Sequence, residues 1–325
     1  MTKWHRIHYS FARYAFLDAL RLCGMQQGDV VYLPSFICRD VLAPVHELGG
    51  RVEFYDVDRS LRPIMPDRRM PARAILAVNY FGFPQYLADL QRFADDVGAV
   101  VIEDNAHGYL SRNQEGIELG HRTGLGFTSF RKTLRVVNGA FLDVDLDKFP
   151  SASGLEESAP ITTRLPLSFQ IRRLTANVER VTRLPLLNTG RATVRSMRRL
   201  AGRSVIPELD ESEHMMPAHR AVHVSALQTM HALNHEHEVL RRRQLFTQTA
   251  SRLRAANVEL VFPELPPNTS PWCVAFYATP TQLARAKRAV RGLGIEIFQW
   301  PNLPSDVVGT CPDFYSQVHV ISMMK

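Results

Sequence analysis

Cysteine is scarce in this chain, and long apolar runs are missing. Its four cysteines lie far apart and include no Cys-x-x-Cys pair: Cys23, Cys38, Cys273 and Cys311. This scatter argues against a disulfide framework or a zinc site and favours reduced thiols in a cytoplasm. No apolar stretch approaches the ~20 residues of a membrane span, and the N-terminus lacks the apolar core of a signal peptide. We therefore expect a cytoplasmic protein.

Acidic residues are almost absent from residues 164–203, which hold ten arginines and Glu179 as the single acid. This segment accounts for much of the net charge of +7. Its apolar residues keep helical spacing, so an inserted amphipathic helical segment with a solvated basic face is the plain interpretation. Contact with an anionic membrane surface or with a nucleotide diphosphate is the alternative. It has no nucleic-acid-binding motif and almost no aromatics, so we expect no nucleic-acid partner.

Strand-like and helix-like segments alternate along the first half of the chain. Buried-type or alternating strand patterns occur at residues 30–33, 51–57, 74–78, 100–102, 127–130 and 141–144. Helical spacing occurs at residues 10–24 and 87–97. The alternation predicts an α/β protein with a largely parallel sheet. A length of 325 residues suits one large and one small domain, which we place at residues 1–215, with a basic insert at 160–205, and at 216–325.

An acidic pair and a lysine follow two of the predicted strands. Glu103-Asp104 close the run at 100–102, and Arg131-Lys132 follow the run at 127–130. The carboxyl ends of strands in open α/β sheets are where ligands bind. Pyridoxal phosphate needs an anion beside its ring nitrogen and a lysine for its aldehyde, so this pattern is typical of an enzyme that uses that cofactor.

The same stretch resembles a known family. The sequences EDNAH at 103–107, SFRK at 129–132 and Asn138-Gly139 are similar to the DegT/DnrJ/EryC1/StrS sugar aminotransferases, fold-type I pyridoxal phosphate enzymes. Family members usually read E-D-x-A-Q, then S-F-x-x-x-K, and a Gly-Gly pair seven and eight residues after the lysine. Gly139 and Ala140 occupy the last two places, so Lys132 is the matching lysine, although two residues are missing between Phe130 and Lys132.

The resemblance implies a fold and a set of roles. The fold is a three-layer large domain with a smaller α+β C-terminal domain, which lacks one strand–helix unit that relatives carry. Lys132 would hold the cofactor and move the proton, with Arg131 disfavouring its ammonium form. The remaining cofactor-binding residues would be Asp104 at the ring nitrogen, His107 in place of the glutamine, and Ser129, Ala12 and Arg13 at the phosphate. Cys38, which stands where the family often has an aromatic residue, is either a ring contact or a buried thiol.

The implied activity is amino transfer, with glutamate as donor and a keto-sugar nucleotide as acceptor, for polysaccharide or cell-surface sugar biosynthesis. The resemblance also implies a homodimer in which Arg220 reaches the neighbouring subunit's site. A related branch has histidine in place of the lysine and dehydrates sugars; Lys132 argues against that branch.

Two other classes stay open. The chain could be a degenerate member that binds without turnover, because Phe11-Ala12-Arg13 replaces the usual Ser-Gly-Thr. It could also be an unrelated α/β enzyme in which Glu103-Asp104 holds a metal and Lys132 a substrate phosphate. We expect no metal at His235-Glu236-His237, because residues at i and i+2 do not share a helix face.

Overall fold

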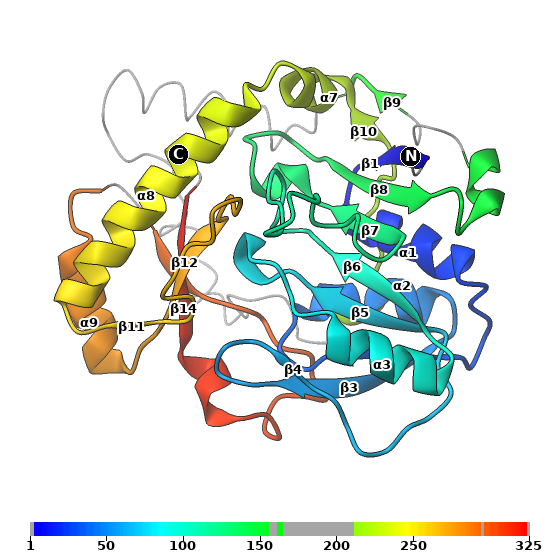
Figure 1. The fold of residues 1–325 in the computed structure, drawn as a ribbon, viewed down its shortest axis with the longest axis horizontal. Coiled ribbons are helices and arrows are strands. Elements are labelled where there is room, and N and C mark those ends of the chain that lie inside the picture. The colour runs from blue at the N-terminus through cyan, green and yellow to red at the C-terminus, as the bar shows by residue number, and fades with distance from the viewer. Residues whose placement is uncertain (1–2, 156–160, 165–210, 294–295, 324–325) are drawn as a thin grey trace, which may run out of the picture.

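The structure is a computed structural model that describes residues 3–155, 161–164, 211–293 and 296–323. Figure 1 shows a large sheet with helices on both faces and, beside it, a smaller sheet flanked by a long helix. Most of the predicted basic insert lies outside the described residues.

An eight-stranded sheet forms the middle of the larger part of the molecule, with its strands in the order β1-β8-β7-β6-β5-β2-β3-β4. Its strands are β1 (Trp4–Tyr9), β2 (Val30–Pro34), β3 (Arg51–Val57), β4 (Pro63–Ile64), β5 (Ala74–Val78), β6 (Val100–Asp104), β7 (Leu125–Thr128) and β8 (Ala140–Asp145). The strands from β7 through β6, β5 and β2 to β3 run parallel, and the outer pairings are antiparallel. The predicted parallel core is confirmed.

Helices cover both faces of this sheet, which confirms the predicted three-layer arrangement. In the view of Figure 1, α3 (Ala88–Val97) lies in front of the sheet, and α1 (Ala12–Leu22) and α2 (Ala43–Glu47) lie behind it. Helix α1 packs on β7, β8 and β1, with Phe16 and Leu20 fully buried. Burying one such side chain contributes about 1.5–3 kcal/mol.

Both faces of the inner strands are covered, which explains their unbroken apolar runs. Every residue of β2 and of β5 is buried. A strand between two helical layers has no solvent face, so its sequence does not alternate.

Two features of the sheet edge differ from the sequence-based prediction. Strand β1 pairs antiparallel with β8 and was not predicted. The predicted strand at 127–130 instead runs from Leu125 to Thr128. The chain then turns through a short 3-10 helix, Phe130–Lys132, in which the Arg131 amide donates to the carbonyl of Gly139 at 3.1 Å.

A second, four-stranded antiparallel sheet is built from the C-terminal part of the chain, in the order β11-β12-β14-β13. Its strands are β11 (Glu259–Leu260), β12 (Cys273–Tyr277), β13 (Ile297–Gln299) and β14 (Val318–Ser322). Helices α8 (His235–Ala255) and α9 (Pro280–Ala289) lie beside it (Figure 1). The composition matches the predicted α+β C-terminal part, but β14, which lies between β12 and β13, was not predicted.

Four further short elements lie between β8 and β11 in the chain: β9 (Ile161–Thr162), α6 (Glu211–His214), β10 (Val222–His223) and α7 (Val224–His231). Strands β9 and β10 pair in parallel as a small sheet of their own. Backbone and side chain of Ser10 bond to the carbonyls of Arg220 and His219, so the segment before β10 runs beside the start of α1.

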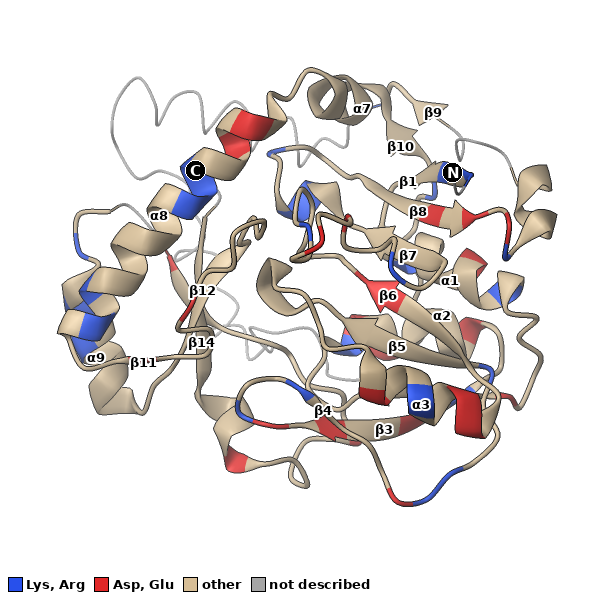
Figure 2. Ribbon diagram, viewed as in Figure 1, with Lys and Arg blue, Asp and Glu red and all other residues tan. Residues whose placement is uncertain are grey.

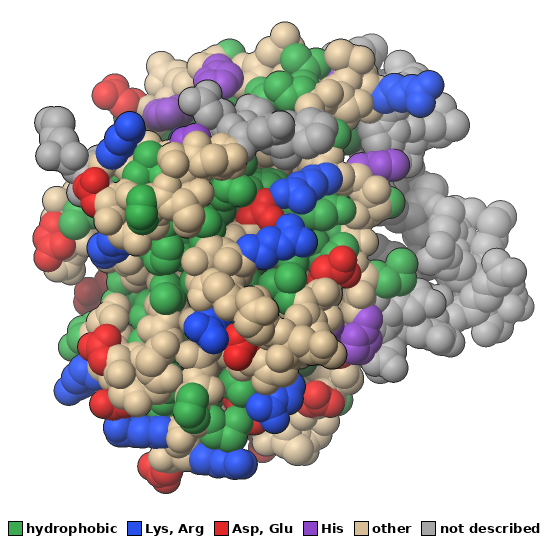
Figure 3. Space-filling model, turned by 90° about the vertical axis from the view of Figure 1, so that its right-hand side faces the viewer, with side chains coloured by type: hydrophobic (Ala, Val, Ile, Leu, Met, Phe, Trp, Pro, Cys, Tyr) green, Lys and Arg blue, Asp and Glu red, His purple; other side chains and the backbone are tan. Residues whose placement is uncertain are grey.

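Figure 2 shows basic residues on α8 and α9, and Figure 3 shows a face on which acidic, basic and apolar side chains are interspersed. Within the described ranges, no helix is both long enough and apolar enough to cross a membrane.

Candidate active site

Glu103 and Asp104 end strand β6 and point to opposite faces of the sheet, because successive side chains of a strand alternate. Asp104 lines a cavity at the start of α1. Glu103 points the other way, where its carboxylate meets the guanidinium of Arg122 at 2.7 Å. Two carboxylates on opposite faces cannot chelate one ion, so this geometry disfavours the alternative of a Glu103-Asp104 metal site.

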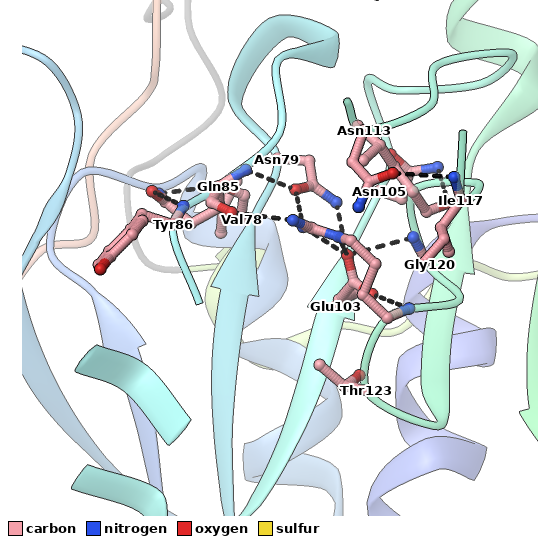
Figure 4. Close-up of polar contacts among 12 residues, drawn as sticks. Val78, Asn79, Gln85, Tyr86, Glu103, Asn105, Asn113, Ile117, Gly120 and Thr123 are labelled. Atoms are coloured by element: carbon pink, nitrogen blue, oxygen red, sulfur yellow. Dashed lines mark hydrogen bonds and ion pairs between the residues drawn. The ribbon is translucent and has the colours of Figure 1, made fainter. Parts of the chain in front are cut away.

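Glu103 is fully engaged in a structural network (Figure 4). Its carboxylate accepts hydrogen bonds from the backbone amides of Arg122, at 2.6 Å, and Gly120, at 3.2 Å, and from the side-chain amide of Asn79, at 3.1 Å. Gly126 of β7 lies under the same loop, where a Cβ atom would stand 2.1 Å from the carbonyl oxygen of Gly120. The network therefore holds the loop at 118–122 against the end of strand β6.

The predicted site residues come together at one cavity of about 180 Å³. All six line it: Ala12, Arg13, Asp104, His107, Ser129 and Lys132. The cavity lies between the first turn of α1, the carboxyl ends of β6 and β7, and two tryptophans from the C-terminal part of the chain, Trp272 and Trp300. The individual roles of the six residues stay predictions.

Lys132 contacts His107 inside this cavity. The Lys132 Nζ lies 3.0 Å from the His107 Nε2. The imidazole stacks on the indole of Trp272, with ring centres 4.2 Å apart and an angle of 6° between the ring planes. Trp272 in turn donates its indole N–H to the carbonyl of Lys132 at 2.8 Å. The three residues thus hold one another in place.

Burial and charge shift the pKa values of this pair. Burial lowers the pKa of Lys132; Cys38 and Asp104 oppose that shift, and Arg131 adds to it in the expected direction. Burial, with a smaller effect of Lys132, holds the pKa of His107 well below its usual range. The imidazole is therefore neutral near pH 7, and its Nε2 can accept a hydrogen bond from the Lys132 amine.

Asp104 sits in the same dry environment. It is 6% exposed, and one carboxylate oxygen accepts the Ala106 amide at 2.8 Å. Burial raises the pKa of Asp104, while Lys132 and the Ala106 amide act in the opposite direction. A cation placed against this carboxylate would restore the charge that burial disfavours.

The start of α1 forms the other end of the cavity. Phe11 caps the helix with an extended backbone and supplies no side-chain acceptor. The first N–H groups of a helix have no intrahelical partner and favour an anion. Ser129, which is only 1% exposed, lines the same cavity, and its hydroxyl has no hydrogen-bond partner in the described part of the chain.

Gly139 explains one of the sequence motifs physically. Its φ of +144° is in a region that other residues avoid, and a Cβ atom there would stand 2.2 Å from the ring of Phe130. Its amide donates to the carbonyl of Ser10 at 2.7 Å. The glycine therefore lets the Lys132 turn pack against the segment that leads into α1.

Three further residues bear on the predictions. Cys38 lines the cavity, as a ring contact requires, and burial raises the pKa of its thiol to about 11. Arg220, expected to reach a partner's site, pairs with Asp18 of its own chain and is not among the cavity residues. Sequence reasoning missed Trp272 and Trp300 as cavity residues, since no local pattern separates them from core tryptophans.

A larger cavity, of about 730 Å³, lies on the opposite face of the sheet. Thr128 and Asn105 line it, whereas their neighbours Phe127 and Asp104 line the smaller one. The chemistry of the predicted site residues therefore belongs to the smaller cavity.

The donors of the smaller cavity fit pyridoxal phosphate. It offers an amine on Lys132, a buried carboxylate on Asp104, and an unpartnered Ser129 hydroxyl beside a helix N-terminus. These are the groups that the aldehyde, the ring nitrogen and the phosphate of that cofactor require.

Comparison with known proteins finds a family model that matches part of this chain. Residues 3–140 match the model of the DegT/DnrJ/EryC1/StrS aminotransferase family. The match confirms the resemblance predicted from the sequence and, with it, the predicted class of pyridoxal phosphate-dependent aminotransferases. The matched range contains every predicted site residue.

Solved structures share the fold at low sequence identity. DesV of S. venezuelae, solved in complex with a ketimine intermediate, is 17% identical with a TM-score of 0.61, over 98% of this chain and 79% of DesV. A DegT DnrJ EryC1 StrS aminotransferase from Brucella abortus is 16% identical with a TM-score of 0.60, over 99% and 81%. GDP-4-keto-6-deoxy-D-mannose-3-dehydratase of E. coli, with bound hydrated PLP, is 12% identical with a TM-score of 0.60, over 100% and 85%. The predicted fold class is confirmed.

Proposed function

Since residues 3–140 match the DegT/DnrJ/EryC1/StrS aminotransferase family, we propose that this chain is a pyridoxal phosphate-dependent enzyme that aminates a keto-sugar nucleotide, with glutamate as the amino donor. We place the reaction in polysaccharide or cell-surface sugar biosynthesis in the cytoplasm, and we propose that the protein acts as a homodimer. The observation that carries the proposal is that Lys132, Asp104 and Ser129 line one cavity.

Lys132 is the proposed catalytic residue. When bound, pyridoxal phosphate supplies a ring that accepts the electrons of a carbanion formed next to the amino group. The Lys132 amine moves the proton to and from that carbon. Its lowered pKa enlarges the neutral fraction near pH 7, which a proton acceptor needs. The contact with His107 Nε2 at 3.0 Å orients the amine within the cavity.

The other residues bind, orient and exclude water. Asp104 would lie against the ring nitrogen and keep it protonated, and His107 would contact the ring substituents. Ser129 and the first turn of α1, at Ala12 and Arg13, would hold the phosphate. Trp272 and Trp300, from the C-terminal part of the chain, line the same cavity and would help to exclude water from the reacting atoms.

A dehydratase is the second candidate, because one enzyme of this fold removes a sugar hydroxyl. In the resembled family that branch carries histidine in place of the lysine. Lys132 stands at that position here and its amine enters the cavity, which favours amino transfer.

Two measurements test the proposal. Borohydride reduction of the cofactor-loaded protein should trap the cofactor on the lysine that holds it, and peptide mapping should find the label on Lys132. Label on Lys148 with Lys132 unmodified would remove the assignment. A panel of keto-sugar nucleotides, assayed with glutamate, should then show amino transfer to at least one of them; loss of water without amino transfer would favour the dehydratase.

A further inference from the structure

Arg131 lies at the end of the cavity that the start of α1 forms, whereas its neighbour Lys132 contacts His107. Both follow Ser129 in the 3-10 turn after β7. The guanidinium carbon of Arg131 lies 4.9 Å from the centre of the Phe11 ring, directly before the first turn of α1. The side chain therefore lines the same cavity as Ser129.

The charge around Arg131 is unbalanced. Burial lowers the pKa of its guanidinium, the nearby Arg13 lowers it further, and Asp40 opposes both. The contact of Asp40 is with Arg13, at 4.0 Å, and its side chain is 51% exposed. Both arginines line the cavity, and a half-exposed carboxylate at the limit of ion-pair distance compensates them poorly. The Arg13 guanidinium also donates to the carbonyl of Met215 at 3.0 Å, whereas no such bond engages the Nε of Arg131 within the described residues.

Arg131 also carries a donor without an acceptor. Its Nε is buried and makes no hydrogen bond within the described part of the chain. The Ser129 hydroxyl, in the same cavity, is equally unpartnered. A buried donor without a partner is costly, more so when the group is charged, so two of them beside a helix N-terminus point to an anion as their ligand.

We propose that Arg131, paired with Arg13, is a phosphate-binding residue that grips the cofactor's phosphate opposite the first turn of α1. This inference rests on the proposed function and adds to it a reason for the departure from Ser-Gly-Thr at the start of α1. Two arginines, one hydroxyl and the first N–H groups of α1 border this end of the cavity, and the anion that can bond to all of them is a doubly charged group with three acceptor oxygens. A carboxylate, with two oxygens and one charge, leaves part of this set unused.

The site should therefore recognise the phosphate separately from the ring. Binding of pyridoxal phosphate and of pyridoxal, which lacks the phosphate, can be followed by quenching of the cavity tryptophans. The wild-type protein should prefer pyridoxal phosphate by more than tenfold. Arg131→Gln should weaken pyridoxal phosphate binding by about tenfold or more, the usual worth of a charged hydrogen bond, and leave pyridoxal binding nearly unchanged. Inorganic phosphate should compete with pyridoxal phosphate in the wild type and less well in the variant.

Arg135 supplies a matched control, because it is an exposed arginine of the same loop. Arg135→Gln should bind both compounds like the wild type. Arg131→Lys keeps the charge and should retain part of the preference, which also answers the case in which Arg131→Gln fails to fold.

The inference would be overturned if Arg131→Gln weakened the binding of pyridoxal phosphate and of pyridoxal equally, or weakened neither. An unchanged preference together with a raised KM for glutamate would assign Arg131 to the donor's carboxylate instead. A wild-type protein that binds neither compound would remove the proposed function itself, an outcome distinct from a wild type that binds both without preference.

Discussion

The indole N–H of Trp272 donates a hydrogen bond of 2.8 Å to the backbone carbonyl of Lys132, and the indole ring stacks on His107. These residues are 140 positions apart, one before strand β12 of the C-terminal sheet and the other after β7 of the large sheet. The C-terminal part of the chain therefore holds both the backbone of the central lysine and the ring that its amine contacts.

Arg242 strengthens the same junction, and we predict that its loss destabilises the fold. Its fully buried guanidinium donates to the carbonyls of Thr133 and Pro271, both at 3.1 Å, and pairs with Glu238 at 2.7 Å. Arg242→Met leaves the two carbonyls without this donor, although Glu238 keeps its pair with Arg241. Since a buried acceptor without a partner costs about 1–3 kcal/mol, the free energy of unfolding should fall by about 2–6 kcal/mol, measured by urea denaturation. Arg254→Met, on the exposed end of the same helix, should cost less than about 1 kcal/mol. Equal effects of the two changes would contradict this role.

Asp104 and Glu103 should respond in opposite ways to neutralisation. Asp104→Asn should reduce amino transfer roughly a thousandfold, because it removes the anion that keeps the cofactor ring protonated in a dry site. Its unfolding free energy should not fall, since the raised pKa of Asp104 shows that the folded state disfavours the charge. Steady-state rates and urea denaturation measure the two effects. A variant within about threefold of the wild-type rate would show that Asp104 does not serve the ring nitrogen.

Glu103→Gln should instead act on stability. The change leaves the nearly buried Arg122 without its counter-ion, and we expect a loss of about 3 kcal/mol in the free energy of unfolding. Cofactor binding by the folded fraction should persist, because Glu103 faces away from the cavity. Glu118→Gln breaks an exposed ion pair with Arg112 and should cost no more than about 1 kcal/mol. The prediction fails if the two variants are equally stable.

Lys132 predicts a pH dependence of stability in the ligand-free protein. Its folded pKa is lowered, so the folded state binds fewer protons than the unfolded state between that pKa and the usual value of 10.5. The burial of its charge therefore costs stability below the folded pKa, and this cost disappears as the pH rises through the folded pKa toward 10.5. Lys132→Met should be more stable than the wild type near pH 7, with a gain that shrinks toward pH 10.5. A gain that does not change with pH would trace to packing rather than to charge.

We propose a homodimer because the cavity has few cations left to bind the two phosphates of a keto-sugar nucleotide. The cations that line it, Arg13, Arg131 and Lys132, are assigned to the cofactor, and Arg220 pairs with Asp18. A second chain would supply further cations. Light scattering at low micromolar concentration should give the mass of two chains. A mass of one chain would mean that a single subunit binds the acceptor alone, and the dimer would be withdrawn.

Local pattern was enough to find the strands of the parallel core, and the family resemblance pointed to six residues that line the smaller cavity. Strands buried on both faces carry unbroken apolar runs, so β2 and β5 could be read directly. Motif spacing located Lys132 and Asp104 because cofactor chemistry requires an amine and an anion at neighbouring strand ends. Strands β1 and β14 were not predicted; β1 is largely half-buried and mixes aromatic, histidine and arginine residues, so its sequence shows no clear period.

Sequence alone determined the residue types of the site and their order along the chain, because spacing and hydrophobic period are local properties. Tertiary structure decided which face each residue uses and which distant residues meet. It turned Asp104 toward Lys132 and Glu103 toward Arg122, and it brought Trp272 onto the lysine turn. Such choices depend on how strands pair and sheets pack over separations of a hundred residues or more, and no local pattern records them.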